Sequence, residues 1–390
     1  MRKIAVVAAK RTPTGGIVSE LSHISDVKLL AHIFSAAVCG INEDIIDYAI
    51  VGSSFPVEHD NLCRKALLEA GLSPKIGAST ISKTCASSDE AFAIACDKIL
   101  AGKAKTVLVG GAEKISNSPY ILQFMKRHVK NHVKGTLPLL CDIQETIQEN
   151  DMSYICETLS KKYSISREKQ DWFAVQSWKK AASANANGYF KKEIAPIKYE
   201  KDGVQYSPSK DETLLDKATE EDVRNATPMF VKDGVLTQYN IAQMNDCAAA
   251  IVLMEHNEAK RQGLKPLAYV HDTSSIGVEA SMRGLAMDRC ILEILKKNKL
   301  EMSQIGLFEL NESFAAQAIM LIENLGIDLE RVNVNGGNLA LGYPIGATGM
   351  RMYVTLLHEM KRRKTQYGLS SMCAGGNMAH AVIFRNEELT

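Results

Sequence analysis

Two cysteines occupy positions at which a thiol could take part in a reaction. Cys85 lies in "STISKTCASSDEAFAIACDKILAG", at the junction between an expected strand and the helix that follows it. The free N–H groups and the positive end of a helix dipole favour a thiolate there and lower its pKa, which makes Cys85 a candidate nucleophile. The alternative is a buried structural thiol, the usual fate of a lone cysteine and our interpretation of Cys96 in the middle of the same helix.

Asn311 and Cys373 each follow another apolar strand. Asn311, in "GLFELNESFAAQAIM", lies at an expected helix start, where its amide either caps the helix or orients a water or an oxyanion. Capping is the favoured interpretation of that motif alone. Cys373, in "SSMCAGGNMAH", lies beside two glycines that let a ligand or another backbone come close. It could transfer a proton, although a packed thiol is again the default.

Tyr343 lies in the Gly-rich turn "NGGNLALGYPIGATG", between an expected strand and a long expected helix. A phenol with a pKa near ~10 is a poor base at neutral pH and a good hydrogen-bond donor. His380, seven residues after Cys373, is only a remote candidate for a base, since a lone histidine in an apolar strand is usually a core residue.

The composition excludes several classes of partner. The chain has 390 residues, 46% of them hydrophobic, enough for one large core or two ordinary ones. Its 46 basic and 45 acidic residues give no broad electrostatic footprint for nucleic acid or an anionic membrane. The first apolar run meets Lys10, too early for a signal peptide or a spanning helix. The nine scattered cysteines lack paired CxxC spacing, which predicts no metal site and favours a reducing cytoplasm.

Short apolar runs alternate with helical segments along most of the chain. This rhythm predicts an α/β fold with a mainly parallel sheet and right-handed crossovers. The expected helices lie near residues 26–39, 60–71, 86–101, 284–298, 312–325 and 346–362. The expected strands lie at residues 3–9, 47–53, 77–82, 106–113, 267–273, 305–310, 331–336, 368–376 and 378–384.

The rhythm divides the chain into two halves, residues 1–260 and 265–390. Each half has a strand that ends in Gly-Gly after its third helix, at Gly110-Gly111 and Gly375-Gly376. Between them, residues about 115–240 are more polar and charged. We expect this stretch to be an inserted, partly helical loop domain lying over the first half.

A set of motifs in fixed order resembles the thiolase family over the whole chain. The motifs are "CAS" at Cys85, "GGAEKISNSPY" (110–120), "ISREKQDWFAVQSWKKA" (165–181), "NESFAAQ" (311–317), "NVNGGNLALGYPIGATG" (333–349) and "MCAGG" (372–376). The resemblance implies a thiolase fold, in which two βαβαβαββ halves stack in five layers (αβαβα) with an inserted loop domain. It also implies a homodimer or homotetramer.

The resemblance further implies an acyltransferase that forms an acyl-enzyme and makes or cleaves a carbon–carbon bond by Claisen condensation or thiolysis. Cys85 matches the acylated cysteine, Cys373 the acid/base cysteine and Asn311 the residue that holds an oxyanion-hole water. Tyr343 falls where the family has a histidine. The substrate would be coenzyme A or another pantetheine thioester, with no permanently bound cofactor. The substrate-binding residues that the resemblance implies are Met152, Ala242, Met282, Phe314 and Gly375.

Several departures from the family pattern surround the acyl-thioester site. "DETLLDK" has Leu215 where the family has a nucleotide-binding arginine, with Lys217 nearby. Ala242-Gln243 replaces a Ser-Gly pair, and "CASSD" places Asp89 one turn into the helix. Two interpretations stay open: an acyltransferase with an altered substrate or carrier, and a catalytically inactive scaffold or partner subunit. A thioester hydrolase is a third.

A carrier protein would need a complementary surface. The basic run of Lys126, Arg127, Lys130 and Lys134 could meet an acidic carrier, although a solvated loop face is the favoured interpretation of such a run.

Overall fold

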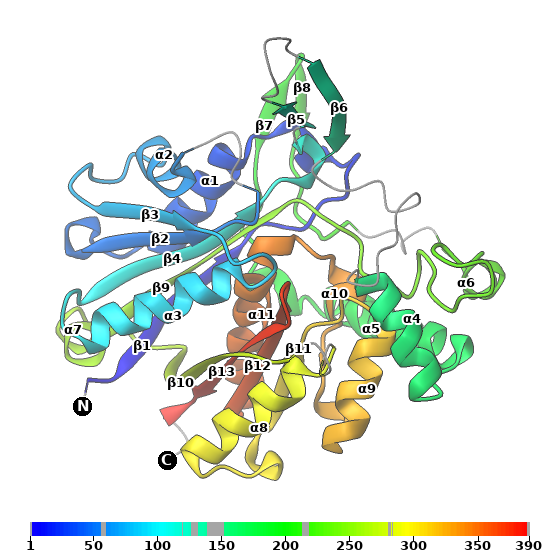
Figure 1. The fold of residues 1–390 in the computed structure, drawn as a ribbon. Coiled ribbons are helices and arrows are strands. Elements are labelled where there is room, and N and C mark those ends of the chain that lie inside the picture. Colours follow the sequence, from blue (N-terminus) through cyan, green and yellow to red (C-terminus); the bar gives the residue numbers. More distant parts are fainter. Residues whose placement is uncertain are drawn as a thin grey trace.

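The computed structural model describes residues 2–55, 60–118, 120–125, 132–138, 152–212, 218–279, 282 and 284–387. Nine strands form the central sheet: β1 (Ile4–Arg11), β2 (Tyr48–Gly52), β3 (Gly77–Ile81), β4 (Thr106–Glu113), β9 (Cys247–Glu255), β10 (Ala268–Gly277), β11 (Leu307–Leu310), β12 (Tyr367–Ala374) and β13 (Met378–Arg385). Their order is β11-β12-β13-β10-β1-β9-β4-β2-β3 (Figure 1). The first strand, β1, joins two groups of strands by pairing with both β9 and β10.

The two groups repeat one pairing pattern. In the first, β2 pairs parallel with β4, β4 antiparallel with β9, and β9 antiparallel with β1. In the second, β11 pairs parallel with β12, β12 antiparallel with β13, and β13 antiparallel with β10. The expectation of a mainly parallel sheet is therefore wrong, because five of the eight strand pairings in this sheet are antiparallel.

The second correction concerns residues 331–336, which were expected to form a strand. In the first half, β3 pairs parallel with β2 at the sheet edge. The corresponding place beside β11 holds only an isolated bridge between Phe308 and Val332. Asn333 has a positive φ of 43°, which ends extended backbone there. The other eight expected strands are present with shifted ends.

Six long helices complete a layered arrangement. They are α1 (Asp26–Val38), α2 (Leu62–Glu69), α3 (Ser87–Leu100), α8 (Ala286–Asn298), α9 (Ala315–Leu325) and α11 (Thr348–Arg363). Helices α1 and α2 share a core with the outer face of the first strand group, and α8 and α9 share one with the second (Figure 1). Helices α3 and α11 lie between the two groups. The layers therefore run helix, sheet, helix, sheet, helix, as expected.

The two central helices approach closely where the candidate site begins. A Cβ added at Gly349 of α11 would lie 1.9 Å from Oδ2 of Asp89 in α3, so only glycine fits at that crossing. Phe92 of α3 packs edge-on against Tyr353 of α11, with ring centroids 5.0 Å apart. Cys85 precedes α3 and Tyr343 precedes α11, and these two helices contact each other.

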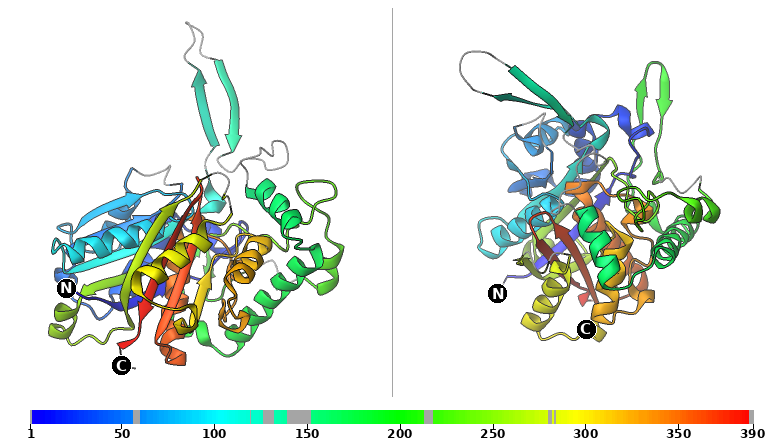
Figure 2. Two further views of the ribbon diagram at one scale, coloured as in Figure 1. Left: turned by 60° about the horizontal axis from the view of Figure 1, so that its bottom comes forward. Right: turned by 45° about the vertical axis from the view of Figure 1, so that its right-hand side comes forward.

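The segment between β4 and β9 is the insertion. It contains the hairpins β5–β6 (Tyr120–Met125, His132–Pro138) and β7–β8 (Tyr199–Lys201, Val204–Tyr206), which project from the body in Figure 2, and the helices α4 (Met152–Lys162), α5 (Arg167–Ala186) and α6 (Glu220–Asn225). Helices α4 and α5 pack against α9, and α5 also packs against α10 (Asn338–Leu341). The insertion thus covers part of the second half, and its residues Ala195 and Ile197 also pack against the first half, over which it was expected to lie.

Residues of two motifs in the insertion lie outside the part of the chain that the structure describes. Lys126, Arg127 and Lys130 of the basic run lie outside the described residues, as do Leu215 and Lys217; Lys134 lies in β6. Among the helices that the structure describes, none combines the length and the apolar character needed to cross a membrane.

Candidate active site

Cys85 lies two residues before α3, at a strained turn. Thr84 has a φ of 49°, a left-handed conformation that costs energy for a β-branched residue. Two bonds hold it: its carbonyl accepts from Ser54 Oγ at 2.6 Å, and its Oγ1 accepts from the Gly375 N–H at 2.9 Å. The Cys85 thiol is half-buried. The turn therefore presents the thiol at the surface of the core rather than inside it.

The expected fall in the pKa of Cys85 is wrong. Burial raises the pKa of the thiol, and the nearby Glu113 carboxylate acts in the same direction. Hydrogen bonds from Tyr343 and from the N–H groups of Cys85 and Gly375 lower the pKa, but less than burial raises it. The N-cap of α3 is Ala86, so Cys85 directly precedes the cap.

Tyr343 follows the short helix α10 and lies directly beside Cys85. Its N–H donates to the Gln243 carbonyl at 2.8 Å and its carbonyl accepts from Asn245 N–H at 3.3 Å. These two backbone bonds to residues 243–245 hold the turn at Tyr343 in place. Its side chain is 7% exposed. Burial, with both nearby thiols, raises the pKa of Tyr343 well above its ordinary value, so the phenol stays protonated.

Asn311 and Cys373 form the opposite side of the site. Helix α9 begins at Ala315 with Phe314 as N-cap, so the favoured interpretation of Asn311 as a capping residue is wrong. Its Nδ2 instead donates to Cys373 Sγ at 3.0 Å and to Ser313 Oγ at 2.8 Å. The Cys373 thiol donates to Gln317 Oε1 at 3.8 Å, and burial raises its pKa to about 12.

A buried row of polar side chains lies behind Asn311. Arg351 Nη2 donates to Asn338 Oδ1, and Asn338 Nδ2 donates to Asn311 Oδ1. All three side chains have no exposed surface. Burial lowers the pKa of Arg351, and the carboxyl of Glu309 opposes this most. The row fixes the orientation of the Asn311 amide, because each oxygen faces a donor.

Glu113, at the end of β4, ties two loops of the site together. Its carboxylate accepts from the N–H groups of Ser54 and Gly346, each at 2.8 Å. A Cβ at Gly346 would lie 2.7 Å from Glu113 Oε2, which explains a glycine there. Burial raises the pKa of Glu113. The carboxylate thus joins the loop after β2, which bonds Thr84 through Ser54, to the loop after Tyr343.

Four of the five expected substrate-binding residues lie near this group. Gly375 is bonded to Thr84, and the Ala242 N–H donates to the Ser313 carbonyl at 2.9 Å. Phe314 and Met152 pack together in a small apolar cluster. Met282 lies in a turn before α8 and hydrogen-bonds through its backbone to residues 279 and 285.

His380 is a buried residue of the core. It lies in β13, opposite Met372 and Ser275, and is 1% exposed. Among the described residues neither ring nitrogen has a hydrogen-bond partner, and burial lowers the pKa to about 3. The neutral ring is a core group, as the sequence had suggested.

Three residues of this site were not singled out from the sequence: Ser313, Asn338 and Glu113. Each lies inside a motif that was recognised, "NESFAAQ", "NGGNLALGYPIGATG" and "GGAEKISNSPY". Ser313 lies two residues after Asn311, which was the available signal for it. Glu113 and Asn338 bond residues that are distant in sequence, Ser54 and Gly346 for Glu113 and Asn311 for Asn338, and no local pattern shows such contacts.

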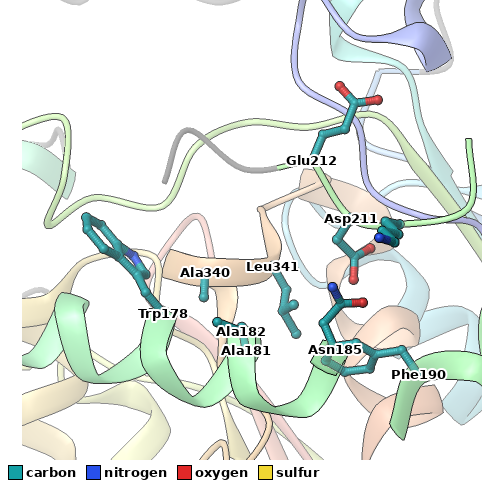
Figure 3. A pocket seen from close by; sticks show the side chains of 10 residues that line it. Trp178, Ala181, Ala182, Asn185, Phe190, Asp211, Glu212, Ala340 and Leu341 are labelled. Atoms are coloured by element: carbon teal, nitrogen blue, oxygen red, sulfur yellow. The ribbon is translucent and has the colours of Figure 1, made fainter. Parts of the chain in front are cut away.

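A separate cavity lies beside α10. It has a volume of about 440 Å³ and lies between α5 and α10, with Trp178 at one end and Phe190 and Asn185 at the other (Figure 3). Ala340 and Leu341 form part of its wall. None of Cys85, Asn311, Tyr343 and Cys373 lines it.

Comparison with known proteins decides the family. Residues 4–257 match the thiolase N-terminal domain and residues 264–386 match the thiolase C-terminal domain. The chain belongs to the thiolase family. It is 37% identical over 400 residues to a 3-ketoacyl-CoA thiolase of Bacillus subtilis (strain 168), covering 98% of this chain and 99% of that protein.

Solved thiolase structures have the same fold. The crystal structure of the Bacillus anthracis acetyl-CoA acetyltransferase superposes with a TM-score of 0.94 at 33% identity, over 99% of both chains. The human mitochondrial 3-ketoacyl-CoA thiolase in complex with CoA gives 0.90 at 31% identity, over 99% of this chain and 98% of that one. The expected thiolase fold is confirmed, and this thiolase is an acyltransferase enzyme.

Proposed function

We propose that the protein carries an acyl group as a thioester on Cys85 and uses it to make or cleave a carbon–carbon bond. The observation that supports this most is the grouping of two thiols, Cys85 and Cys373, around Tyr343 and Asn311. A nucleophile, a hydrogen-bond donor and a second thiol within one group are what acyl transfer followed by proton removal requires.

In the first half-reaction, Cys85 attacks the carbonyl carbon of an acyl thioester and the donor thiol leaves. We assign to Tyr343 the donation of a hydrogen bond, since its phenol is protonated and already bonded to Cys85. The N–H groups of Cys85 and Gly375, which point at the sulfur, are suited to stabilise developing negative charge beside it.

In the second half-reaction, Cys373 removes an α-proton from a second thioester. The carbanion then attacks the acyl group on Cys85, or the steps run in reverse with a thiol as acceptor. Both N–H bonds of Asn311 are donated within the site, one of them to Cys373 Sγ. We therefore assign to Asn311 the stabilisation of the Cys373 thiolate, in place of the water-holding role that the resemblance implied.

Tyr343 stands where we align the family histidine, and this substitution points to an altered substrate or carrier. Losing an adjacent base commonly costs ~10²–10⁴ in rate, while a thiol is the nucleophile that depends on a base least. The donor is coenzyme A or another pantetheine thioester, free or on a carrier protein. The raised pKa values of both thiols agree with slow acylation.

The remaining expectations form part of this proposal. We place the site between the halves 1–260 and 265–390, in a homodimer or homotetramer, in a cytoplasm that keeps both thiols reduced. Size-exclusion chromatography with light scattering measures the assembly.

Intact mass spectrometry tests the function. The protein is incubated with acetyl-CoA, acetyl-pantetheine and an acetylated carrier protein, and its mass is followed over time. We expect one acyl adduct, lost in Cys85→Ser and kept in Cys39→Ser, whose thiol is exposed and distant in sequence. The adduct should persist until an acceptor thioester or thiol is added.

Two other outcomes would support the alternatives. An adduct that clears in water without any acceptor indicates a thioester hydrolase. No adduct with any of the three donors, in a protein that is folded by thermal unfolding, indicates an inactive scaffold and contradicts the proposal.

A further inference from the structure

Two amide side chains contact the sulfur of Cys373 with groups of opposite kind. Asn311 Nδ2 donates to the sulfur at 3.0 Å, and the Cys373 thiol donates to Gln317 Oε1 at 3.8 Å. Both amides are buried, since Asn311 has no exposed surface and Gln317 is 2% exposed. The contact with Asn311 favours a thiolate. The contact with Gln317 favours a thiol, because a thiolate has no hydrogen to donate to an oxygen.

The turn before α8 sets the orientation of the Gln317 amide. Gln317 Nε2 donates to the carbonyl of Gly284 at 3.4 Å. A carbonyl only accepts, so the amide turned over would set its oxygen against that carbonyl. Gly284 has a φ of 82°, and a Cβ there would lie 2.4 Å from Leu159 Cδ1, so glycine is required in this turn. The oxygen of Gln317 therefore faces Cys373.

The Asn311 amide is fixed with its nitrogen towards the same sulfur. Its Oδ1 accepts from Asn338 Nδ2, and its second N–H donates to Ser313 Oγ at 2.8 Å. Each amide thus has a partner that prevents it from exchanging its donor for its acceptor. Cys373 consequently has a fixed donor and a fixed acceptor, whatever the charge on its sulfur.

Two titratable groups, Cys85 and Tyr343, lie close enough to Cys373 to interact with its charge. Burial raises the pKa of both, so both are protonated at neutral pH and add no charge beside the sulfur. The two amides therefore decide which form of Cys373 is favoured. We propose that Gln317 is a positioning residue for the acid/base thiol: its oxygen holds the S–H of Cys373 and favours the protonated form.

This inference rests on the proposed function and deepens it. When the Cys373 thiolate removes the α-proton of the second thioester, the carbon–hydrogen bond breaks and its electron pair stays on carbon as the carbanion. A sulfur–hydrogen bond forms, and the new S–H donates to Gln317 Oε1. Because this contact favours the proton-bound sulfur, it makes the thiolate a stronger base, which suits the removal of a weakly acidic α-proton.

Site-specific alkylation tests the contact without any acyl donor. The whole chain is treated with iodoacetamide at pH 7, 8 and 9, and initial rates at Cys373 and at the exposed Cys39 are read from peptide masses. In Gln317→Met, which is similar in size and has no oxygen, we expect Cys373 to react about three- to tenfold faster at each pH. The reason is that the lost hydrogen bond favoured the thiol over the thiolate. The rate at Cys39 should not change.

Two further variants separate this effect from a loosened core. Asn311→Leu removes the donor on the same sulfur and should slow Cys373 about tenfold, because hydrogen bonds to charged groups are the stronger ones. A loosened core would speed the reaction of Cys373 in both variants. Gln170→Met replaces another buried glutamine, whose amide nitrogen bonds Ser160 and the Ile165 carbonyl, and should leave the rate at Cys373 unchanged.

A second reagent distinguishes the charge on the sulfur from access to it. A larger thiolate fraction multiplies the rates with iodoacetamide and with the bulkier N-ethylmaleimide by the same factor, whereas a wider opening favours the bulkier reagent. Gln317→Glu, which keeps an oxygen towards Cys373, should react no faster than the wild type with either reagent.

Three results would overturn the role of Gln317. They are an unchanged or lower Cys373 rate in Gln317→Met, a rise that Gln317→Glu shares, and a rise that differs between the two reagents. Removal of the α-proton is measured separately, as uptake of deuterium into acetyl-CoA in deuterium oxide, with Cys373→Ser as the control. If the alkylation pattern appears and the wild-type protein exchanges no α-proton, the contact stands and the proposed function fails.

Discussion

The amide nitrogen of Asn311 lies 3.0 Å from the sulfur of Cys373, and the orientation of that amide is set from behind by Asn338. Arg351 completes the row by donating to Asn338. A hydrogen bond to a charged group is stronger than one between neutral groups, so the row is positioned to act most when Cys373 is a thiolate. The buried positive charge of Arg351, which is linked to Asn311 through Asn338, strengthens the same effect.

Asn338→Ala should weaken both the fold and the reactivity of Cys373. It leaves Asn311 Oδ1 and Arg351 Nη2 without a buried partner, which costs about 1–3 kcal/mol for each unsatisfied group. Urea unfolding should therefore show a stability lower by at least about 1 kcal/mol, and alkylation of Cys373 should slow. Asn187→Ala, at an exposed helix end, is the control. An unchanged Cys373 rate in a destabilised Asn338→Ala protein would show that the row is structural only.

The pH dependence of alkylation should reflect the burial of Cys373. Its pKa is raised to about 12, so the thiolate fraction should rise about tenfold for each pH unit from 7 to 10 without levelling off. The exposed Cys39 serves as an internal reference in the same digest. A plateau of the Cys373 rate below pH 9 would mean that the site stabilises the thiolate much more than its burial allows.

The sequence predicted the layers of the fold, and the roles of Cys85, Asn311, Tyr343 and Cys373 stay predictions. Alternating apolar runs placed eight of the nine expected strands and all six expected helices, because buried strands and amphipathic helices differ in period. It did not predict the antiparallel return of β9 and β13. Strand direction depends on which strands pair in the folded protein, and the whole insertion separates β4 from its partner β9 in the sequence.

The sequence predicted the pKa values and hydrogen bonds of these residues less well than it predicted which residues lie together. The pKa of Cys85 was expected to fall because the helix start was visible in the sequence, whereas the burial that raises it was not. Asn311 was assigned to a cap because helix onset was placed three residues too early. Ser313 and Asn338 went unassigned because their partners come from other elements.

Tyr343→His should raise the rate of acylation by CoA thioesters at neutral pH. An imidazole has an ordinary pKa near ~6.5 and accepts a proton that the phenol cannot. We expect an increase of at least about tenfold, within the ~10²–10⁴ commonly supplied by an adjacent base. The measurement is the single-turnover rate of adduct formation, with Tyr239→His as a control for a new histidine. An unchanged or lower rate would contradict the interpretation of Tyr343 as the replacement of a base.

Asp89→Asn should stabilise the protein at neutral pH and not at acid pH. Asp89 lies in α3 with Oδ2 buried and without a partner among the described residues, while Oδ1 accepts from Tyr353 at 2.7 Å. Burial raises its pKa from 3.8 to about 6. The folded state therefore holds a proton that the unfolded chain has lost, and the stability from this group, full below about pH 4, is lost as the pH rises towards 6.

Asparagine keeps the acceptor for Tyr353 and has no charge to bury, so the variant should escape that loss. The free energy of unfolding should exceed that of the wild type by about 2–3 kcal/mol at pH 7, and the difference should shrink below pH 4. Urea unfolding at pH 4, 5, 6 and 7 measures it, with Asp202→Asn in an exposed turn as the control. A variant less stable than the wild type at pH 7 would mean that the ionised carboxylate has a partner that favours it.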